Sequence, residues 1–458
     1  MRNIFLILLG ILFCPILFST EAFCQTGSII TQVKDSSGAA VSGAKLIIRN
    51  VATNNERTVQ TDLAGTYQVL QLIPGEYEIR TEVEGFEPLT KKVFLDIGIT
   101  AEVTFTLYAS ATTEIVEVSA ANEIASRTRT ESSTNVNNAS IGSLPINRRN
   151  FLDFTLTSPR VVPDRVPGQG AAATSGLSFN GQPARQNNIK IDGFENNDSS
   201  NGSVRSTFSQ DAVQEFQVIS DSYSAEFGRA LGGVVNIITK GGSNSFHTRL
   251  FGLIRNDEIS ARDAFTTDEP NYEQYQFGVT FGGPIKKDKA FFFTSFERLS
   301  IKQNRFVTIT DQTVDALKRV GITGTTNGAN PFAIGTTTTL ARIDYTINPK
   351  NLFYFRYNGG FTFNGSFEPF GALISQTNSG VQNLRDNSVA FGNTYLGSSG
   401  LVNETRFIFS RREQVVSPVD NIGPQVQVVA PEGLVTTGQG TLLPQPKDDR
   451  IYQFVNNT

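Results

Sequence analysis

The sequence predicts a mainly β protein, and three observations lead to that fold class. The chain contains 40 glycines and 35 phenylalanines but no tryptophan, a composition typical of many short, aromatic-bearing strands and turns. Residues 25–108 consist of short alternating segments separated by turn residues, which indicates an N-terminal β-sandwich. Residues 243–458 contain longer alternating segments, as expected for the N-terminal part of a transmembrane antiparallel β-barrel.

Length and charge limit the classes of function. A chain of 458 residues is too long for one ordinary core, and about three domains are expected. The 39 Lys and Arg side chains face 43 Asp and Glu side chains, which gives a net charge of −4. This balance offers no general attraction to phosphate groups, so we expect no nucleic-acid partner.

Residues 1–24 have the pattern of a secretory signal peptide. A basic start at Arg2 is followed by an apolar run over residues 4–18 and a cleavage pattern that ends at Cys24. A membrane anchor would need about 20 apolar residues, and the polar residues 19–21 end the run too early. A lipoprotein modified at Cys24 is disfavoured because the preceding Phe23 is bulky.

The cysteine count excludes several chemistries. The two cysteines, Cys14 and Cys24, both lie within the predicted signal peptide. If cleavage follows Cys24, the mature chain contains no cysteine. Zinc fingers, disulfide scaffolds and thiol catalysis are then excluded.

The sandwich, residues 25–108, is expected to contain about seven strands at the spacing of a β-sandwich. Their expected positions are residues 27–33, 44–49, 57–61, 66–70, 76–83, 91–96 and 101–107. The phrases at residues 62–67, 73–77 and 85–86 resemble the carboxypeptidase regulatory-like family, which implies a transthyretin-like sandwich. That family is often carbohydrate-binding-like, but no aromatic platform for a sugar is visible here. We therefore predict a spacer or docking module.

Residues 109–119 are a predicted linker rich in Ser, Thr and Ala, with one apolar segment embedded in it. That segment consists of Glu114, Ile115, Val116, Glu117 and Val118. It resembles a TonB box, in which an acidic residue and β-branched residues add as an edge strand to the sheet of an energy-transducing partner. Two alternatives remain open: the segment is a last strand of the sandwich, or it is a structureless tether.

Residues 120–242 are predicted to form a mixed α/β plug domain. Residues 211–242 combine an acidic strand, a glycine-punctuated turn and a β-branched run from Val234 to Thr239. This order of motifs resembles the end of the plug of TonB-dependent outer-membrane receptors. The plug motif residues are Asp192, Gly193, Gly228, Gly232, Gly233 and Asn236. The glycine pair suggests close approach of the backbone to another surface. The alternative is an ordinary strand, turn and strand in a soluble α/β domain.

Other phrases extend the resemblance across the plug. Residues 144–151, 179–181 and 188–193 match plug phrases, and residues 151–156 predict a helix or turn ended by Pro159. Residues 162–175 are rich in Pro, Gly and Ala and show no strand pattern, so we predict a loop there.

The barrel part begins after Ser245. Its expected strands are residues 246–255, 274–281, 289–299, 338–347, 351–361, 387–396 and 404–412. Residues 348–351 predict a short periplasmic turn, whereas residues 301–336 predict a long, polar outer loop. Residues 276–285, followed by residues 287–293, resemble the Oar-like branch of the receptor family.

The chain departs from that family in its extent. Receptor barrels of this kind have about 22 strands. Residues 246–458 number 213, which at roughly 25 residues per strand and connection allows eight or nine strands. The chain also shows no terminal aromatic strand before Thr458. We therefore expect a C-terminally truncated barrel from an incomplete reading frame, which does not close into a pore.

Little in the sequence predicts catalysis or metal binding. The single histidine, His247, is expected at the entry of the first barrel strand. Residues 192–198 are rich in oxygen ligands but lack the spacing of a calcium loop, and the glycines at residues 168–170 precede no helix. We predict no catalytic residue, cofactor or metal site, and no enzymatic activity.

The leading hypothesis is an outer-membrane transporter of a Gram-negative-type bacterium. The resemblance implies uptake of a large or scarce ligand, such as a carbohydrate, siderophore or peptide. Its expected partners are outer-membrane lipid, an unidentified extracellular ligand and the periplasmic C-terminal domain of a TonB-type energy transducer. Two alternatives remain: an adhesion or secretion-associated outer-membrane protein on the same scaffold, and a carbohydrate-binding-like periplasmic or secreted module.

Overall fold

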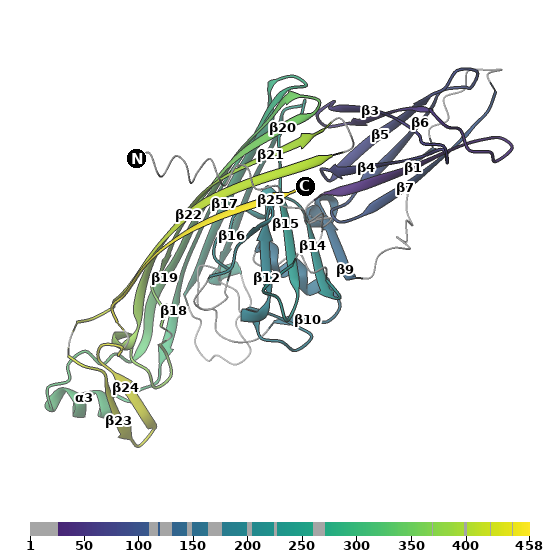
Figure 1. Cartoon of the computed structure of the whole chain (residues 1–458). Coiled ribbons are helices and arrows are strands. Elements are labelled where there is room, and N and C mark those ends of the chain that lie inside the picture. Colours follow the sequence, from purple (N-terminus) through teal and green to yellow (C-terminus); the bar gives the residue numbers. More distant parts are fainter. Residues whose placement is uncertain are drawn as a thin grey trace, which may run out of the picture.

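The computed structural model describes most of the chain, and this part is mainly β (Figure 1). The described residues are 26–109, 118–119, 131–143, 149–163, 176–198, 204–223, 227–259, 271–368, 370–397, 401–421, 423–441 and 443–458. Three parts are visible: an N-terminal sandwich, a central plug, and a long sheet that we call the wall. No helix in the described ranges is both long and apolar enough to cross a membrane.

The sandwich contains two sheets, ordered β4-β1-β7 and β3-β2-β5-β6-β8. Their strands are β1 (Gly27–Asp35), β2 (Lys45–Asn50), β3 (Glu56–Gln60), β4 (Thr66–Leu72), β5 (Gly75–Glu82), β6 (Leu89–Leu95), β7 (Thr100–Leu107) and β8 (Val118–Ser119). Alternate residues of each strand point into one apolar core. Tyr77 and Ile79 of β5, for example, are buried there with Leu46 and Phe105. The seven predicted strands are confirmed to within two residues at each end.

The plug is built on a five-stranded sheet ordered β13-β12-β15-β14-β9. Its strands are β9 (Ser132–Asn137), β12 (Asn188–Ile191), β13 (Phe194–Glu195), β14 (Val213–Asp221) and β15 (Val234–Thr239). A separate hairpin pairs β10 (Val161–Pro163) with β11 (Leu177–Phe179). Short helices connect the strands: α2 (Asn138–Ser143), η1 (Phe151–Thr157), η2 (Ala184–Gln186) and η3 (Gln210–Ala212).

The plug core follows from the apolar runs of its central strands. All six residues of β15 are buried because β12 and β14 pair with it on both sides and helices and the wall cover its faces. Phe154 of η1 packs against Phe216 of β14 with ring centroids 5.6 Å apart. Phe293 and Leu340, two wall residues, belong to the same buried cluster. The plug therefore packs directly on the wall.

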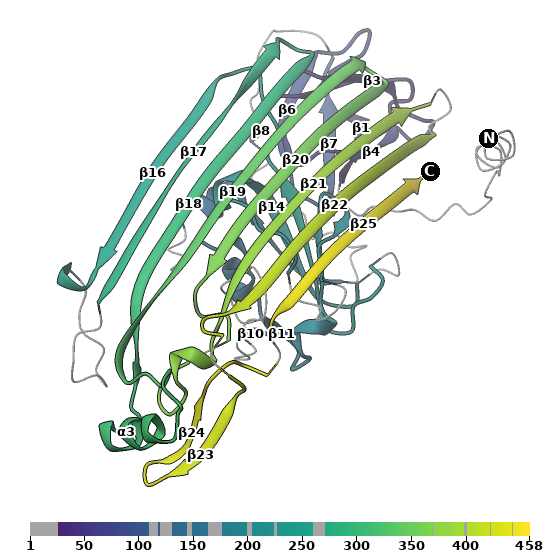
Figure 2. The same cartoon turned by 90° about the vertical axis from the view of Figure 1, so that its left-hand side faces the viewer.

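The wall is an eight-stranded antiparallel sheet. Its strands, in order, are β16 (His247–Asn256), β17 (Tyr272–Lys286), β18 (Ala290–Val307), β19 (Gly328–Asn348), β20 (Asn351–Asn364), β21 (Gly380–Leu396), β22 (Val402–Pro418) and β25 (Gln445–Asn457). Figure 2 shows the strands side by side and tilted, with the plug behind them. Within the described residues β16 and β25 do not pair with each other, so this sheet is open.

The two faces of the wall differ in chemistry because side chains alternate along each strand. The face away from the plug exposes large apolar side chains, and several aromatic pairs lie across neighbouring strands there. Phe281 contacts Phe292 with centroids 5.1 Å apart, and Phe409 contacts Tyr452 at 4.9 Å. The face toward the plug is largely polar: its buried side chains include Gln276, Glu297, Arg342, Arg356, Gln382, Asp386, Arg406 and Arg412.

A small compact unit lies at the end of the wall opposite the sandwich (Figures 1 and 2). It contains α3 (Asp311–Arg319), the hairpin of β23 (Val426–Ala430) and β24 (Gly433–Thr437), and η5 (Gln376–Asn378), while η4 (Asp257–Ile259) follows β16. Its core includes Val314, Leu317 and Val435. The prediction of a polar loop over residues 301–336 is therefore wrong in part. Strands β18 and β19 continue into it, and α3 lies between them.

Two other expectations need correction. Residues 162–163, predicted as loop, belong to β10, because a strand that ends after three residues is too short to show alternation. The chain also carries a further wall strand, β25, that ends at Asn457 and exposes the aromatic residues Tyr452 and Phe454. The first half of β25 shows no alternation of apolar and polar residues because both of its faces carry charges: Lys447 faces the plug, whereas Asp448 and Arg450 lie exposed.

Candidate functional site: the seam between plug and wall

The turn between β12 and β13 presents an aspartate to the wall. Ile191 pairs with Phe194, so Asp192 and Gly193 form a two-residue turn with φ angles of +46° and +80°. Positive φ at both positions is typical of a type I′ turn, which Asp-Gly favours because glycine has no Cβ and aspartate tolerates the left-handed region. The predicted motif Asp192–Gly193 is therefore a tight hairpin at the surface of the plug.

Three wall arginines converge on Asp192. Arg356 of β20 donates to its Oδ2 atom, and Nη1 of Arg342 in β19 lies 3.7 Å from Oδ1. Arg406 of β22 donates from Nη1 to the Asp192 backbone carbonyl at 3.3 Å. Within the plug, Thr239 donates its backbone N–H to Oδ1 at 2.9 Å and its hydroxyl to Oδ2 at 2.7 Å. Asp192 thus joins three wall strands to β15, two through its carboxylate and one through its backbone carbonyl.

The charges of this group are buried but compensated. Burial alone would raise the pKa of Asp192, but Arg356, Arg342 and the Thr239 hydrogen bonds outweigh it and lower that pKa. Arg342 also pairs with Asp344 at 2.8 Å, so two carboxylates balance the two guanidinium groups. Arg406 has its own partner in Glu404 at 3.2 Å. Such a group is stabilising only while it remains complete.

A second ionic group lies further along the seam. Asp198 of the plug accepts from Arg412 Nη1 at 2.7 Å and from Lys447 Nζ at 2.9 Å. The charges are reversed in a further pair, in which the cation Arg205 belongs to the plug and the anion Asp386, 3.2 Å away, belongs to the wall. Both partners contribute cations and anions, so the seam is a set of complementary pairs rather than a surface of one charge.

A third ionic group surrounds Asp211, which is 1% exposed. Arg149 of the plug pairs with it at 2.6 Å, and Arg249 of β16 lies 3.1 Å away. The Arg149 guanidinium also lies over the Phe251 ring of the wall, 3.7 Å from its centroid. Asp211 therefore fixes the beginning of β14 to the first strand of the wall.

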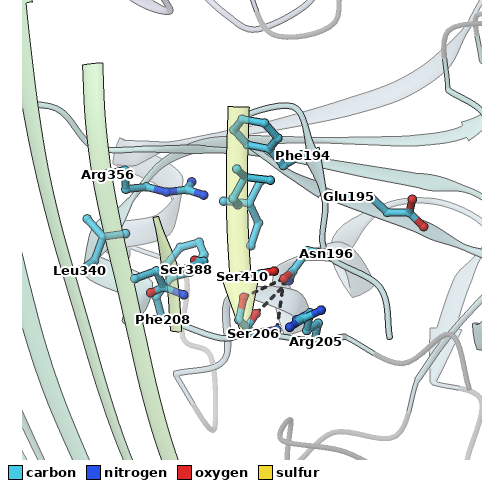
Figure 3. Close-up of a pocket in the computed structure, with 13 residues that line it drawn as sticks. Phe194, Glu195, Asn196, Arg205, Ser206, Phe208, Leu340, Arg356, Ser388 and Ser410 are labelled. Atoms are coloured by element: carbon cyan, nitrogen blue, oxygen red, sulfur yellow. Dashed lines mark hydrogen bonds between the residues drawn. The ribbon is translucent and has the colours of Figure 1, made fainter. Parts of the chain in front are cut away.

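A small cavity lies in the seam (Figure 3). Its volume is about 20 Å³, enough for one water molecule. Plug residues such as Phe194 and Asn196 line it from one side, and wall residues such as Leu340 and Arg356 line it from the other. Asn196 is held by Ser206, whose N–H and hydroxyl both donate to its Oδ1 atom. This cavity is too small for a transported ligand, so the seam is a contact between two parts of the chain.

The other plug motif residues have distinct environments. A Cβ atom at Gly233 would overlap the Phe179 ring, and one at Gly232 would overlap Asn187. Both glycines therefore mark the expected close approach. At Gly228 a Cβ would meet nothing within 4 Å, so close packing does not explain that glycine. Asn236 is fully buried in β15, between β12 and β14.

Only the end of the predicted partner-binding segment is described. Residues 114–117 lie outside the described ranges. Val118 and Ser119 form β8, which pairs in parallel with Lys91 and Lys92 of β6. The end of the segment is therefore an edge strand of the sandwich, the first of the two alternatives left open by the sequence.

Sequence reasoning missed the wall side of the seam. Arg342, Arg356, Arg406 and Arg412 are all nearly buried, yet each occupies a position that simple alternation assigns to a polar lumen. A signal was present, since Arg342 and Arg406 each have an acidic residue two positions away on the same strand face, Asp344 and Glu404. Their convergence on Asp192 and Asp198 depends on the register of separate strands, which the sequence does not state.

Two protein-family models match parts of the chain. Residues 28–108 match the carboxypeptidase regulatory-like domain, and residues 238–338 match the outer membrane beta barrel domain. The TonB-dependent transporter Oar of Myxococcus xanthus is 32% identical over 292 residues, which is 61% of this chain and 27% of that protein. The chain thus spans about a quarter of the length of this relative.

A solved transporter structure has a similar fold. The outer membrane transporter YddB from Escherichia coli matches with a TM-score of 0.50 and 14% identity over 71% of this chain and 45% of that one. The siderophore receptor PirA from Acinetobacter baumannii matches with a TM-score of 0.47 and 16% identity over 70% and 44%. The match to the outer membrane beta barrel domain and the similarity to Oar indicate the outer membrane as the location. The chain is a homologue of a TonB-dependent transporter, with a carboxypeptidase regulatory-like domain before its plug and an outer-membrane β-barrel segment after it.

Proposed function

We propose that this chain is the plug-bearing part of a transporter that takes up a large or scarce ligand, with energy from a TonB-type partner in the inner membrane. We divide it into a signal peptide at residues 1–24, a sandwich at 25–108, a linker with the partner-binding segment at 109–119, a plug at 120–242 and barrel strands at 243–458. The name of the relative Oar supports transport rather than catalysis.

One observation carries this proposal: polar groups, not apolar packing alone, hold the plug against the wall. Asp192, Asp198 and Asp211 each pair with wall cations, so the plug is fixed by a few strong contacts that can be broken and made again. An obstruction that must move needs such a reversible contact. A purely apolar seam would expose a large hydrophobic surface each time it opened.

The path of the chain indicates how force would reach the seam. The partner-binding segment, residues 114–118, precedes β9, which is the edge strand of the plug sheet. A partner that adds its own strand to this segment would pull on β9 before any other plug strand. Among the described strands β9 pairs only with β14, and β14 begins at the Asp211 group. Ligand binding at the opposite end of the wall would favour release of the segment into the periplasm.

Val116→Pro tests the partner. Proline removes one backbone donor and disfavours the extended pairing, so the variant is expected to lose binding to the periplasmic domain of the TonB-type partner. Isothermal titration with that purified domain measures the loss. Ala111→Pro, in the same linker but outside the segment, is the control and should bind normally. Equal affinity for Val116→Pro and Ala111→Pro would reject the proposed role of residues 114–118.

A further inference from the structure

Within the described residues, the short loop between β6 and β7 of the sandwich contacts the plug. Ile97 of this loop donates its backbone N–H to Glu215 Oε1 of β14 at 3.1 Å. Asn135 of β9 donates its amide to the Ile97 carbonyl at 2.9 Å and to the same Glu215 oxygen at 3.1 Å. Ile97 is fully buried and Glu215 is 1% exposed. One carboxyl group therefore joins the sandwich to two adjacent plug strands.

The neighbouring glycine shows how closely the loop approaches the plug. Gly98 has a φ angle of +67°, and a Cβ atom there would lie 2.6 Å from Gln217 Nε2. Gln217 is held in place by Glu131, which accepts from that amide at 3.1 Å. A second contact lies at the same end of the sandwich, since the turn after β2 and the loop after β6 both flank the start of β5. There Asn54 donates to Asp288, in the turn between β17 and β18, at 2.9 Å.

The surroundings of Glu215 determine its protonation. Two acids lie near Glu215: Asp96 of the sandwich, and Glu131 in the segment before β9, which binds the neighbouring Gln217. The residues that face it from β9 and β15 are the neutral Asn135 and Ile238. Burial, followed by the charge of Asp96, raises the pKa of Glu215 to about 9. At neutral pH Glu215 therefore keeps its proton beside Asp96, because burial and a neighbouring acid both disfavour its charged form.

We propose that the sandwich is a proton-dependent clamp on plug strands β9 and β14, closed by the Asp96–Glu215 carboxyl pair. The clamp holds the docked sandwich while the pair keeps its proton. Undocking would expose Glu215 to water and return its pKa toward the ordinary glutamate value of 4.5, so docking would bind a proton between pH 4.5 and about 9. Docking is therefore strongest below pH 4.5, and its equilibrium constant falls by up to about tenfold per pH unit through this window.

The position of the clamp gives the sandwich a role in the proposed transport cycle. β9 is the first described plug strand after the partner-binding segment, and the loop at residues 96–98 holds β9 and its neighbour β14 together. Closing the clamp would oppose the extraction of β9 by a pulling partner. This consequence rests on the proposed function, but docking itself does not, and it is measured without partner or ligand.

Spin labels report docking directly. The two native cysteines lie in the predicted signal peptide, so Leu63→Cys in the sandwich and Leu231→Cys in the plug, both strongly exposed, supply the only labelling sites in the processed chain. Pulsed electron resonance then gives the distribution of distances between them. For the unmodified interface we expect one narrow distance at about pH 6 and a broadened distribution at about pH 10.

Three variants distinguish the effect of the proton on docking from the effect of packing at the interface. Glu215→Gln keeps the acceptor and adds a fixed donor toward Asp96, so its distance should stay narrow at both pH values. Gly98→Ala should broaden the distribution at both, whereas Gly85→Ala, also at positive φ but with no atom within 4 Å of its Cβ, should match the parent. A parent distribution that is broad at low pH, or narrow at both pH values, would overturn the clamp. Broadening of Glu215→Gln at high pH would show that another group titrates.

Discussion

Asp192→Asn is expected to destabilise the attachment of plug to wall by about 3–5 kcal/mol, because it removes the carboxylate that pairs with the buried Arg356 and leaves Arg342 with Asp344 alone. The Arg356 and Arg342 side chains are 3% and 9% exposed, so water cannot replace the lost carboxylate. Asparagine has nearly the same shape and can still accept from Thr239. The loss of stability therefore reports the missing charge rather than a change in packing.

Hydrogen exchange at the backbone amides of β12 and β15 measures this effect, because opening of the seam exposes these strands. Asp221→Asn is the matched control: Asp221 also pairs with an arginine, Arg160 at 3.2 Å, but both side chains are more than half exposed. Removal of such a pair should cost about 0–1 kcal/mol. If the two variants lost the same protection, the Asp192 group would not hold the plug.

Alternation predicted the strands of this chain well wherever one face is apolar. In the sandwich, Tyr77 and Ile79 alternate with charged residues because one side meets the core and the other meets water. In the wall, the predicted strand at residues 338–347 lies within β19, whose Ile343 and Tyr345 face away from the plug whereas Arg342 faces it. The physical cause is local in both cases, so single-sequence reasoning is sufficient.

The same reasoning failed at the outer ends of the wall strands. Strand β18 was predicted to end at Leu299 but continues to Val307, and β21 begins at Gly380 rather than at Asn387. Beyond the apolar band both faces of a strand are polar, as at the consecutive residues Lys302 to Arg305 of β18, so alternation disappears while backbone pairing continues. The compact unit around α3 was missed for a related reason. Its core is assembled from three separate loops.

The candidate site was predictable on one side. Asp192 and Gly193 were identified because a two-residue Asp-Gly turn leaves a local signature. The arginines that surround Asp192 come from strands more than one hundred residues away, and only the sheet register brings them together. Glu215 was unremarked for the same reason: its partner Asp96 belongs to another domain.

Gly233→Ala is expected to have the second largest effect, a destabilisation of about 1–3 kcal/mol from overpacking. An added Cβ would lie 2.6 Å from two ring carbons of Phe179, which is itself fully buried in β11. Neither partner can move easily, since β15 is paired on both sides and the ring is enclosed by the plug core. The exchange protection of β12 and β15 measures the loss. Gly228→Ala, with open space around its Cβ, should leave that protection unchanged.

A double-mutant cycle distinguishes this contact from a general effect of alanine in the strand connection. Phe179→Leu removes the ring, so it costs stability by itself but also removes the clash. In that background Gly233→Ala should cost much less than in the parent chain, which gives a coupling energy of about 0.5–3 kcal/mol. Additive costs would place the strain elsewhere, in the backbone of residues 231–233. Strong coupling would show that the glycine is required because the plug strand passes directly across an aromatic ring.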